Sequence, residues 1–417
     1  MLKDGYKWRA LALLWVAFFL QQGTRQIFGA TLTSIQGSLG VGTTEIGAVA
    51  TVFTFIYGLS VPFAGVAADL LNRKWMVVSG VFVFCLGIFA SGFATSLALL
   101  LVTYGILNGF GQSFYYPSAT SIIGELHRET RATALSILQM GLYTGIIGCS
   151  VASGWLAEKG DDGWRMPFWV FGGLGIVWAL ALALGLRTLS SDNPNNQEIR
   201  QPPKSDNQTI PKPTLSEAFL VFLRHPSALL LAAGLGMMIY VDIGFKTWMP
   251  SHLESCFSIE KGTAALHAVL WHYIGAFVGV TLGARLSDRL VKSRPAVRME
   301  TNIAGLALAV PFIVWMAYTP SLPVCCAAMA LFGVFRGVYD SNLMASLFDI
   351  IPQRYHASGA GIMLSCAFVF GSTSPLVLGL MKERFASATG IASLAAFYLL
   401  GAAFITAARI RQYRTKH

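Results

Sequence analysis

The chain alternates long apolar stretches with short polar segments. A helix needs about 20 apolar residues to cross the hydrocarbon core of a bilayer, and twelve stretches reach about that length. We therefore predict twelve membrane-spanning helices. They fall at about residues 10–35, 44–67, 75–93, 97–123, 132–156, 166–186, 228–250, 263–286, 299–318, 322–350, 357–380 and 389–408.

One long polar segment divides these spans into two groups of six. Its sequence is rich in Ser, Asn, Gln, Asp and Pro, which is typical of a solvated linker. Near its end, LSEAFLVFLRHP has apolar residues at helical spacing, which predicts a short helix at the membrane surface. We expect an N-terminal six-helix bundle over residues 1–186, a cytoplasmic linker over 187–226 and a C-terminal six-helix bundle over 227–417.

The composition agrees with a chain embedded in a membrane. Hydrophobic residues make up 54% of it and charged residues 12%, about half the usual charged share of a soluble domain. These values exclude a water-soluble enzyme and a disordered chain. The net charge of +10 forms no basic stripe interleaved with aromatic residues, so we expect no nucleic-acid partner.

Most Lys and Arg residues gather in alternate polar segments. Such a bias marks the cytoplasmic side of a membrane protein, so we expect an integral protein of the cell (inner) membrane with both termini in the cytoplasm. The six cysteines show no CxxC spacing, and the chain has no HExxH, Ser/His/Asp or Walker pattern. We therefore expect no metal, no cofactor and no enzymatic activity.

Five ionisable side chains lie deep inside the apolar stretches. They are Arg25, Asp242, Lys246, Arg336 and Asp340. Each costs roughly 3 kcal/mol near the bilayer centre, so it must face water, a partner or a substrate. Four of them form two pairs at a spacing of four residues, on one helix face each. Arg25 has no such partner, and a guanidinium can hold a carboxylate or phosphate through two parallel hydrogen bonds.

A repeated pattern follows the second and the eighth span. The first copy, Gly65-x3-Asp69-x3-Arg73-Lys74, resembles the signature between helices 2 and 3 of the major facilitator superfamily, and ARLSDRLVKSR (284–294) resembles its degenerate second copy. The resemblance implies an all-α membrane protein with twelve transmembrane helices in two pseudo-symmetric six-helix halves, working by alternating access. We predict a gating role for four charged residues at these helix ends: Asp69, Arg73, Asp288 and Arg289.

Within that superfamily, the first and seventh spans look closest to organic-anion symporters and organophosphate transporters. Those groups often carry a basic residue on helix 1 that meets an anionic substrate, and Arg25 occupies the matching position. The chain departs from the pattern at Thr24, where many anion symporters have a proton-coupling Asp, and at Ile146, where antiporters have a Pro. Drug/proton antiport is therefore not favoured.

The resemblance also implies that the first, fourth, seventh and tenth spans line a central cavity. The predicted substrate-binding residues are Arg25, Tyr57, Asn108, Gln112, Tyr115, Gln139, Tyr143, Lys246 and Arg336. The predicted proton-coupling residues are Asp242 and Asp340. Asp242 is the approximate pseudo-symmetric counterpart of Arg25, so the two could pair until a substrate anion displaces Asp242. Alternatively, the four-residue pairs are local and purely structural.

The predicted function is secondary transport of a small organic anion, such as a sugar acid, a carboxylate or a phosphate ester, by proton-coupled symport. The alternatives are transport of a neutral sugar, a lipid-like or a drug-like substrate, and a non-transporting sensor of the same fold. The expected partners are the anionic substrate, a proton or other coupling ion and the lipid bilayer, and the expected oligomeric state is a monomer.

Overall fold

The computed structural model describes residues 4–127, 130–160, 162–187, 215–291, 293–294, 296–352 and 355–414. Before the predicted linker, the helices are α1 (Asp4–Leu39), α2 (Thr43–Leu70), α3 (Arg73–Ser91), α4 (Leu97–Leu100), the π-helix η1 (Leu101–Asn108), α5 (Gly109–Ser113), α6 (Tyr115–Leu126), α7 (Arg131–Ala157) and α8 (Arg165–Gly185). After it come α10 (Leu215–Arg224), α11 (Pro226–Phe257), α12 (Lys261–Leu290), α13 (Val297–Tyr318), α14 (Leu322–Phe348), α15 (His356–Gly371), α16 (Ser374–Arg384) and α17 (Ser387–Arg414).

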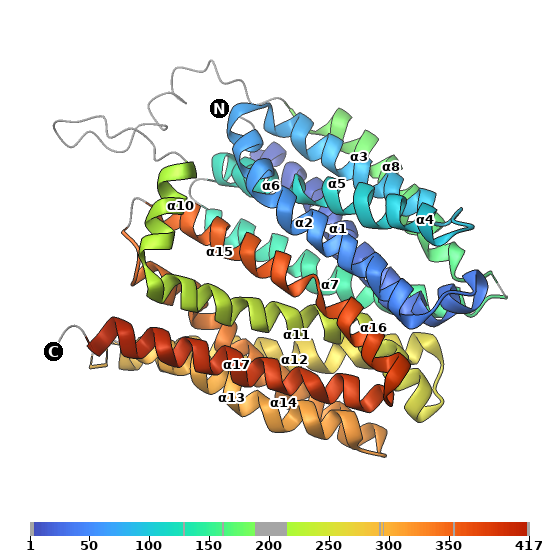
Figure 1. Cartoon of the computed structure of the whole chain (residues 1–417). Helices are drawn as coiled ribbons and strands as arrows, with labels where there is room; N and C mark the ends of the chain where they lie inside the picture. Colours follow the sequence, from blue (N-terminus) through green and yellow to red (C-terminus); the bar gives the residue numbers. More distant parts are fainter. Residues whose placement is uncertain are drawn as a thin grey trace.

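The long helices run side by side, and both ends of the chain lie at the same end of the bundle (Figure 1). Every predicted span is helical, which confirms the all-α fold. The fourth span is the run from α4 to α6, and the eleventh is α15 followed by α16. The short helix predicted at the end of the linker is α10. Most of the linker, residues 188–214, lies outside the described residues.

Eleven segments of the described chain are long and apolar enough to cross a membrane. The first predicted span is not among them, although α1 has 36 residues. Its middle carries a run of polar side chains, from Gln21 and Gln22 through Thr24 and Arg25 to Gln26. This run lowers the hydropathy of α1, and it also supplies polar groups to the interior of the bundle.

Local signals fix where several helices begin. The Asn72 side chain accepts a hydrogen bond from the backbone N–H of Lys74 at the start of α3, and Ser96 caps α4 in the same way. Pro226 opens α11 and Pro375 lies in the first turn of α16, where a missing backbone N–H costs nothing. The break between α15 and α16 therefore follows from the sequence.

The helices before and after the linker pack mainly among themselves. In the first group α1 packs on α7 and α3 on α8, and in the second α12 and α13 pack on α14, while α11 and α13 pack on α17. Glycines allow the closest of these approaches: a Cβ on Gly305 of α13 would come within 2.7 Å of the Phe335 carbonyl oxygen of α14. The two groups meet where α2 faces α15 and α16, α7 faces α12, and α1 faces α11.

Hydrogen bonds between the two groups gather at the end of the bundle opposite the chain termini. Thr43 of α2 donates to the Gly379 carbonyl of α16 at 2.9 Å, and Lys261 of α12 donates to Ser34 of α1 at 2.7 Å. Gly379 also lies so close to α2 that a Cβ there would come within 2.5 Å of the Thr43 carbonyl oxygen. The bundle is therefore closed at this end.

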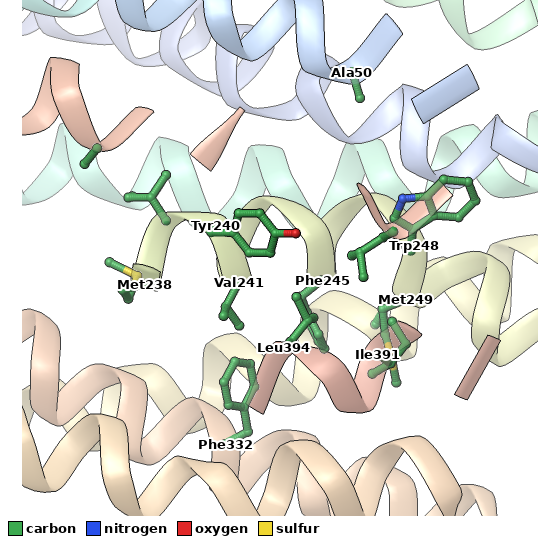
Figure 2. Packing of buried hydrophobic residues seen from close by; sticks show 14 of the residues in the cluster. Ala50, Met238, Tyr240, Val241, Phe245, Trp248, Met249, Phe332, Ile391 and Leu394 are labelled. Atoms are coloured by element: carbon green, nitrogen blue, oxygen red, sulfur yellow. The ribbon is translucent and has the colours of Figure 1, made fainter. Parts of the chain in front are cut away.

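The apolar core of the second group is built around α11. Figure 2 shows Val241 and Phe245 of α11 pointing towards Phe332 of α14, with Leu394 of α17 close by. The Phe245 and Phe332 ring centroids are 5.4 Å apart. Such aromatic packing holds α11 against α14 and α17, and it fixes the helix that carries Asp242 and Lys246.

Candidate functional site

A cavity of about 380 Å³ lies between the two groups of helices. Its volume falls in the range usual for small-molecule sites. Six predicted site residues line it, namely Arg25, Tyr57, Gln139, Asp242, Lys246 and Arg336. The other lining residues are Phe18, Gln22, Gln26, Phe28, Gly29, Ala50, Phe53, Thr54, Tyr104, Tyr116, Leu142, Ile146, Ile239, Ile243, Thr247, Leu364 and Phe368.

Arg25 is held in this cavity from two directions. Its Nε donates a hydrogen bond to the Gln112 side-chain oxygen. Its guanidinium carbon lies 4.2 Å from the centroid of the Tyr57 ring and 5.9 Å from that of Phe53, in cation–π geometry. The Nη2 nitrogen is buried and has no hydrogen-bond partner among the described residues. Arg25 therefore keeps an unsatisfied donor beside the cavity.

Gln112 is itself fixed by its neighbours. Its Nε2 donates to the Asn108 side-chain oxygen at 2.9 Å, and its backbone oxygen accepts from Gln21 at 2.6 Å. Asn108 is the last residue of the π-helix η1, an element that is frequent at functional sites. Asn108 and Gln112 are fully buried and do not line the cavity. They stand behind Arg25 and orient its guanidinium.

The other four charges form one connected network. Lys246 Nζ donates to Asp242 Oδ2 at 2.8 Å, and Arg336 Nη2 lies 3.7 Å from Asp340 Oδ2. Both pairs at four-residue spacing are therefore present. Arg336 Nη2 also lies 3.1 Å from Asp242 Oδ1, an ion pair that joins α14 to α11. The side chains of Asp242 and Arg336 are 11% and 12% exposed, so this bridge is nearly buried.

The expected pairing of Arg25 with Asp242 is not formed. Asp242 contacts Lys246 and Arg336 instead, and no acidic side chain in the described part of the chain forms an ion pair with Arg25. Lys246 and Arg336 already compensate the charge of Asp242 from its own side of the cavity. Arg25 therefore has no acidic partner among the described residues.

His272 of α12 extends the network, although the predicted site set omits it. Its Nε2 lies 3.0 Å from Arg336 Nη1. Its ring packs against Phe245 and Phe332, with centroids 5.1 and 5.0 Å away. For this contact to be a hydrogen bond, Nε2 must carry a lone pair, because the guanidinium can only donate. The lone signal in the sequence was a histidine within an apolar stretch.

Two predicted ligands are placed in packing positions. The Tyr115 hydroxyl donates to the Leu14 carbonyl, and the Tyr115 ring stacks on Phe18 with centroids 5.8 Å apart. Tyr143 meets Tyr273 edge-on across the α7–α12 contact, with centroids 5.8 Å apart. Neither Tyr115 nor Tyr143 lines the cavity. Residue type alone could not distinguish these tyrosines from Tyr57, which does line the cavity.

The predicted gating residues lie near the end of the bundle that carries the termini. The Asp69 side chain lies outside the described residues. Arg73 forms an ion pair with Glu125 of α6, which belongs to the same group of helices. Asp288 and Arg289 are exposed, and neither forms an ion pair within the described segments. Their gating role stays a prediction.

Several aromatic residues of the cavity were missed by the sequence analysis. Phe53 and Tyr104 stand beside Arg25, and their rings are 5.3 Å apart. The Tyr104 hydroxyl also lies 3.4 Å from the Arg25 backbone oxygen, to which it donates. Phe368 meets Tyr57 edge-on at 5.2 Å. Aromatic side chains in apolar spans look alike in sequence whether they face lipid, a neighbouring helix or a cavity.

A second cavity of about 400 Å³ adjoins the first. It shares Tyr116 and Gln139 with the central cavity and adds Thr120 and Ser121 of α6. The polar groups of its lining are hydroxyls and an amide, without a charge. Within the described part of the chain, no group of three or more His, Cys, Asp or Glu residues could hold a metal ion.

Apolar helices in two groups, with a charged cavity between them, define a membrane transporter. Residues 14–375 match the family model described as Major Facilitator Superfamily. The chain therefore belongs to the Major Facilitator Superfamily, which confirms the family predicted from the sequence. It is a membrane transporter and not an enzyme.

Similar proteins include transporters named for organic anions. The D-galactonate transporter of Escherichia coli is 25% identical, with 95% of this chain and 94% of the relative covered. The probable sulfoacetate transporter SauU of Cupriavidus necator is 24% identical, with 90% and 87% covered. The fold also matches a solved structure of a bacterial homologue of the human lysosomal transporter Spinster in an inward-facing and unoccupied conformation. The TM-score is 0.87 and the identity 20%, and the match covers 100% of this chain and 99% of that one.

Proposed function

We propose that this chain is a secondary transporter of a small organic anion, of the sugar acid, carboxylate or phosphate ester class. The observation that carries the proposal is Arg25, whose buried Nη2 has no hydrogen-bond partner among the described residues and whose side chain lines the central cavity. A guanidinium without an acidic partner at the wall of a cavity favours the binding of an anion. The relatives named for D-galactonate and sulfoacetate support the same class.

We propose that transport proceeds by alternating access between two bundles, 1–186 and 227–417, joined by the linker 187–226. The distribution of Lys and Arg supports an inner-membrane location with both termini in the cytoplasm. With that orientation, the hydrogen-bonded closed end faces outward, so we expect access to the cavity of this conformation from the cytoplasm. The gating residues would then contact the other bundle only after the bundles rock towards each other at the cytoplasmic end.

We propose that protons couple to transport through the network of Asp242 and Asp340. Both acids share Arg336, so a proton on one of them changes how Arg336 and Lys246 are held. This arrangement would replace the helix 1 acid found in many anion symporters, whose position here is Thr24. A proton arriving on Asp242 would free two cations at the cavity wall at once.

The test is uptake into proteoliposomes by Arg25 variants. A panel of sugar acids, other carboxylates and phosphate esters identifies the transported anion by thermal shift, and its uptake is then measured. Arg25→Lys keeps the charge but loses the planar fork, so the apparent KM should rise at least about tenfold, and Arg25→Ala should abolish uptake. Arg165→Lys is a matched control, because Arg165 also lies over an aromatic ring, 4.4 Å from Trp164, but does not line the cavity. An unchanged KM in Arg25→Lys would reject the proposal.

A further inference from the structure

The charges around the cavity differ in how fully they are matched. Lys246, Asp242, Arg336 and Asp340 form a chain of ion pairs whose formal charges cancel. Arg25 forms no ion pair with any acidic residue that the structure describes. The cavity therefore presents one uncompensated positive charge, although three cationic side chains stand in or beside it.

The described contacts of Arg25 leave part of its guanidinium without a hydrogen-bond partner. Gln112 occupies the Nε side of the guanidinium, and the Tyr57 ring covers one face at 4.2 Å. The Nη2 nitrogen has no hydrogen-bond partner in the part of the chain that the structure describes. Four N–H donors of the guanidinium remain besides the one at Nε, and one carboxylate, or one edge of a singly charged phosphate, can accept two of them in parallel.

A second negative charge on the substrate would have to take a cation from the network. Lys246 and Arg336 both contact Asp242, at 2.8 and 3.1 Å. Moving either towards the substrate weakens its contact with Asp242, whose side chain is only 11% exposed. An unpaired buried carboxylate is strongly disfavoured unless it is protonated. A divalent substrate therefore needs one proton, on itself or on Asp242.

We propose that the site is matched to a single negative charge: it binds monovalent organic anions directly, and it binds divalent anions only together with one proton. The substrate class becomes the monocarboxylates, sugar acids among them, with phosphate esters bound as the monoanion. This inference rests on the proposed function, because it takes Arg25 as the anion-binding group. In the divalent case a proton from solution forms an O–H bond on the phosphate or on the Asp242 carboxyl, and no other bond changes.

Titratable and charged groups line the cavity or surround its charged network on several elements. They are Arg25 of α1, Tyr57 of α2, Tyr104 of η1, Tyr116 of α6, Tyr143 of α7, Asp242 and Lys246 of α11, His272 and Tyr273 of α12, Arg336, Tyr339 and Asp340 of α14, and Tyr398 of α17. Any of these that titrates would alter the binding of every anion. A monocarboxylate measured over the same pH range corrects for that effect.

The experiment compares a sugar monocarboxylate with a sugar phosphate of equal length, by calorimetric binding to the full chain in detergent. The second pKa of a phosphate ester is about 6, so the monoanion falls about 80-fold in fraction between about pH 5.5 and about pH 8. The phosphate's apparent affinity, divided by that of the monocarboxylate, should fall by about the same factor. Equal affinity ratios at the two pH values would overturn the proposal.

Two variants test whether the network sets this charge limit. Asp242→Asn and Asp340→Asn each leave an extra positive charge near the cavity. At about pH 8, each variant should therefore bind the sugar phosphate at least about tenfold more tightly than the unaltered chain does. The second variant keeps the test valid if the first does not fold. If neither variant restores affinity, the network does not set the limit. Failure of the proposed function gives a different result from failure of the charge limit. If the proposed function is wrong, no anion binds and Arg25→Lys does not change the measured binding.

Discussion

Asp242 is the residue whose replacement most sharply separates a structural role from a functional one. It accepts a hydrogen bond from Lys246 and lies against Arg336, so it is the centre of the four-charge network. Asp242→Asn keeps the shape of the side chain and removes its charge. The network then carries a net positive charge, and the ion pair of Lys246 with residue 242 is lost.

The distances give the size of the effect. With an effective dielectric constant of about 20, unit charges 2.8 and 3.1 Å apart attract by about 6 and about 5 kcal/mol. Desolvation of the ions offsets most of this attraction, and removing one partner of a buried pair costs about 3–5 kcal/mol in practice. We expect Asp242→Asn to lower the free energy of unfolding by about 3 kcal/mol, because the amide oxygen can still accept one hydrogen bond.

The assay is unfolding by SDS in mixed micelles, applied to a double-mutant cycle with Lys246→Gln. The double variant removes one charge of each sign and restores neutrality. It should therefore be more stable than the sum of the two single changes implies, by about 1–3 kcal/mol, since contacting residues couple in that range. Additivity of the two changes within about 0.5 kcal/mol would refute the proposed coupling between these charges.

The same double variant decides the role of Asp242 in transport. If Asp242 carries a proton, the double variant regains stability but its uptake no longer responds to an imposed pH gradient. If the pair is purely structural, stability and proton-driven uptake recover together. Proton-driven uptake that survives in the double variant would remove Asp242 from the coupling mechanism, and Asp340→Asn would then be measured in the same way.

Two further predictions concern packing. Gly379→Ala should open the closed end, because its Cβ would come within 2.5 Å of the Thr43 carbonyl oxygen. A cysteine placed in the cavity should then be alkylated faster by a reagent added from that side. Gly361→Ala, with nothing within 4 Å of its Cβ, should leave the alkylation rate unchanged. Tyr115→Phe should lower the free energy of unfolding by about 1–2 kcal/mol, because the Leu14 carbonyl loses its hydrogen bond, while the KM for the substrate stays as it was. A changed KM would show that Tyr115 contributes to substrate binding after all.

Much of the fold could be predicted because apolar length is a local property. Each predicted span is a helix, and α10 forms where its periodicity indicates. The ion pairs of Lys246 with Asp242 and of Arg336 with Asp340 follow from helical spacing alone. The π-helical segment η1 carried no signal in the sequence, because hydropathy does not distinguish it from an α-helix.

The sequence by itself determined that this chain lies in a membrane, which helices carry charge, and that one guanidinium is in excess. These follow from composition and from contacts within single helices. The tertiary structure alone decided that Asp242 bridges to Arg336 rather than to Arg25, and that Gln112, Tyr57 and Phe53 hold the guanidinium. Pairing between helices depends on which helices are neighbours and on how each is rotated, and spacing along one chain does not encode that geometry.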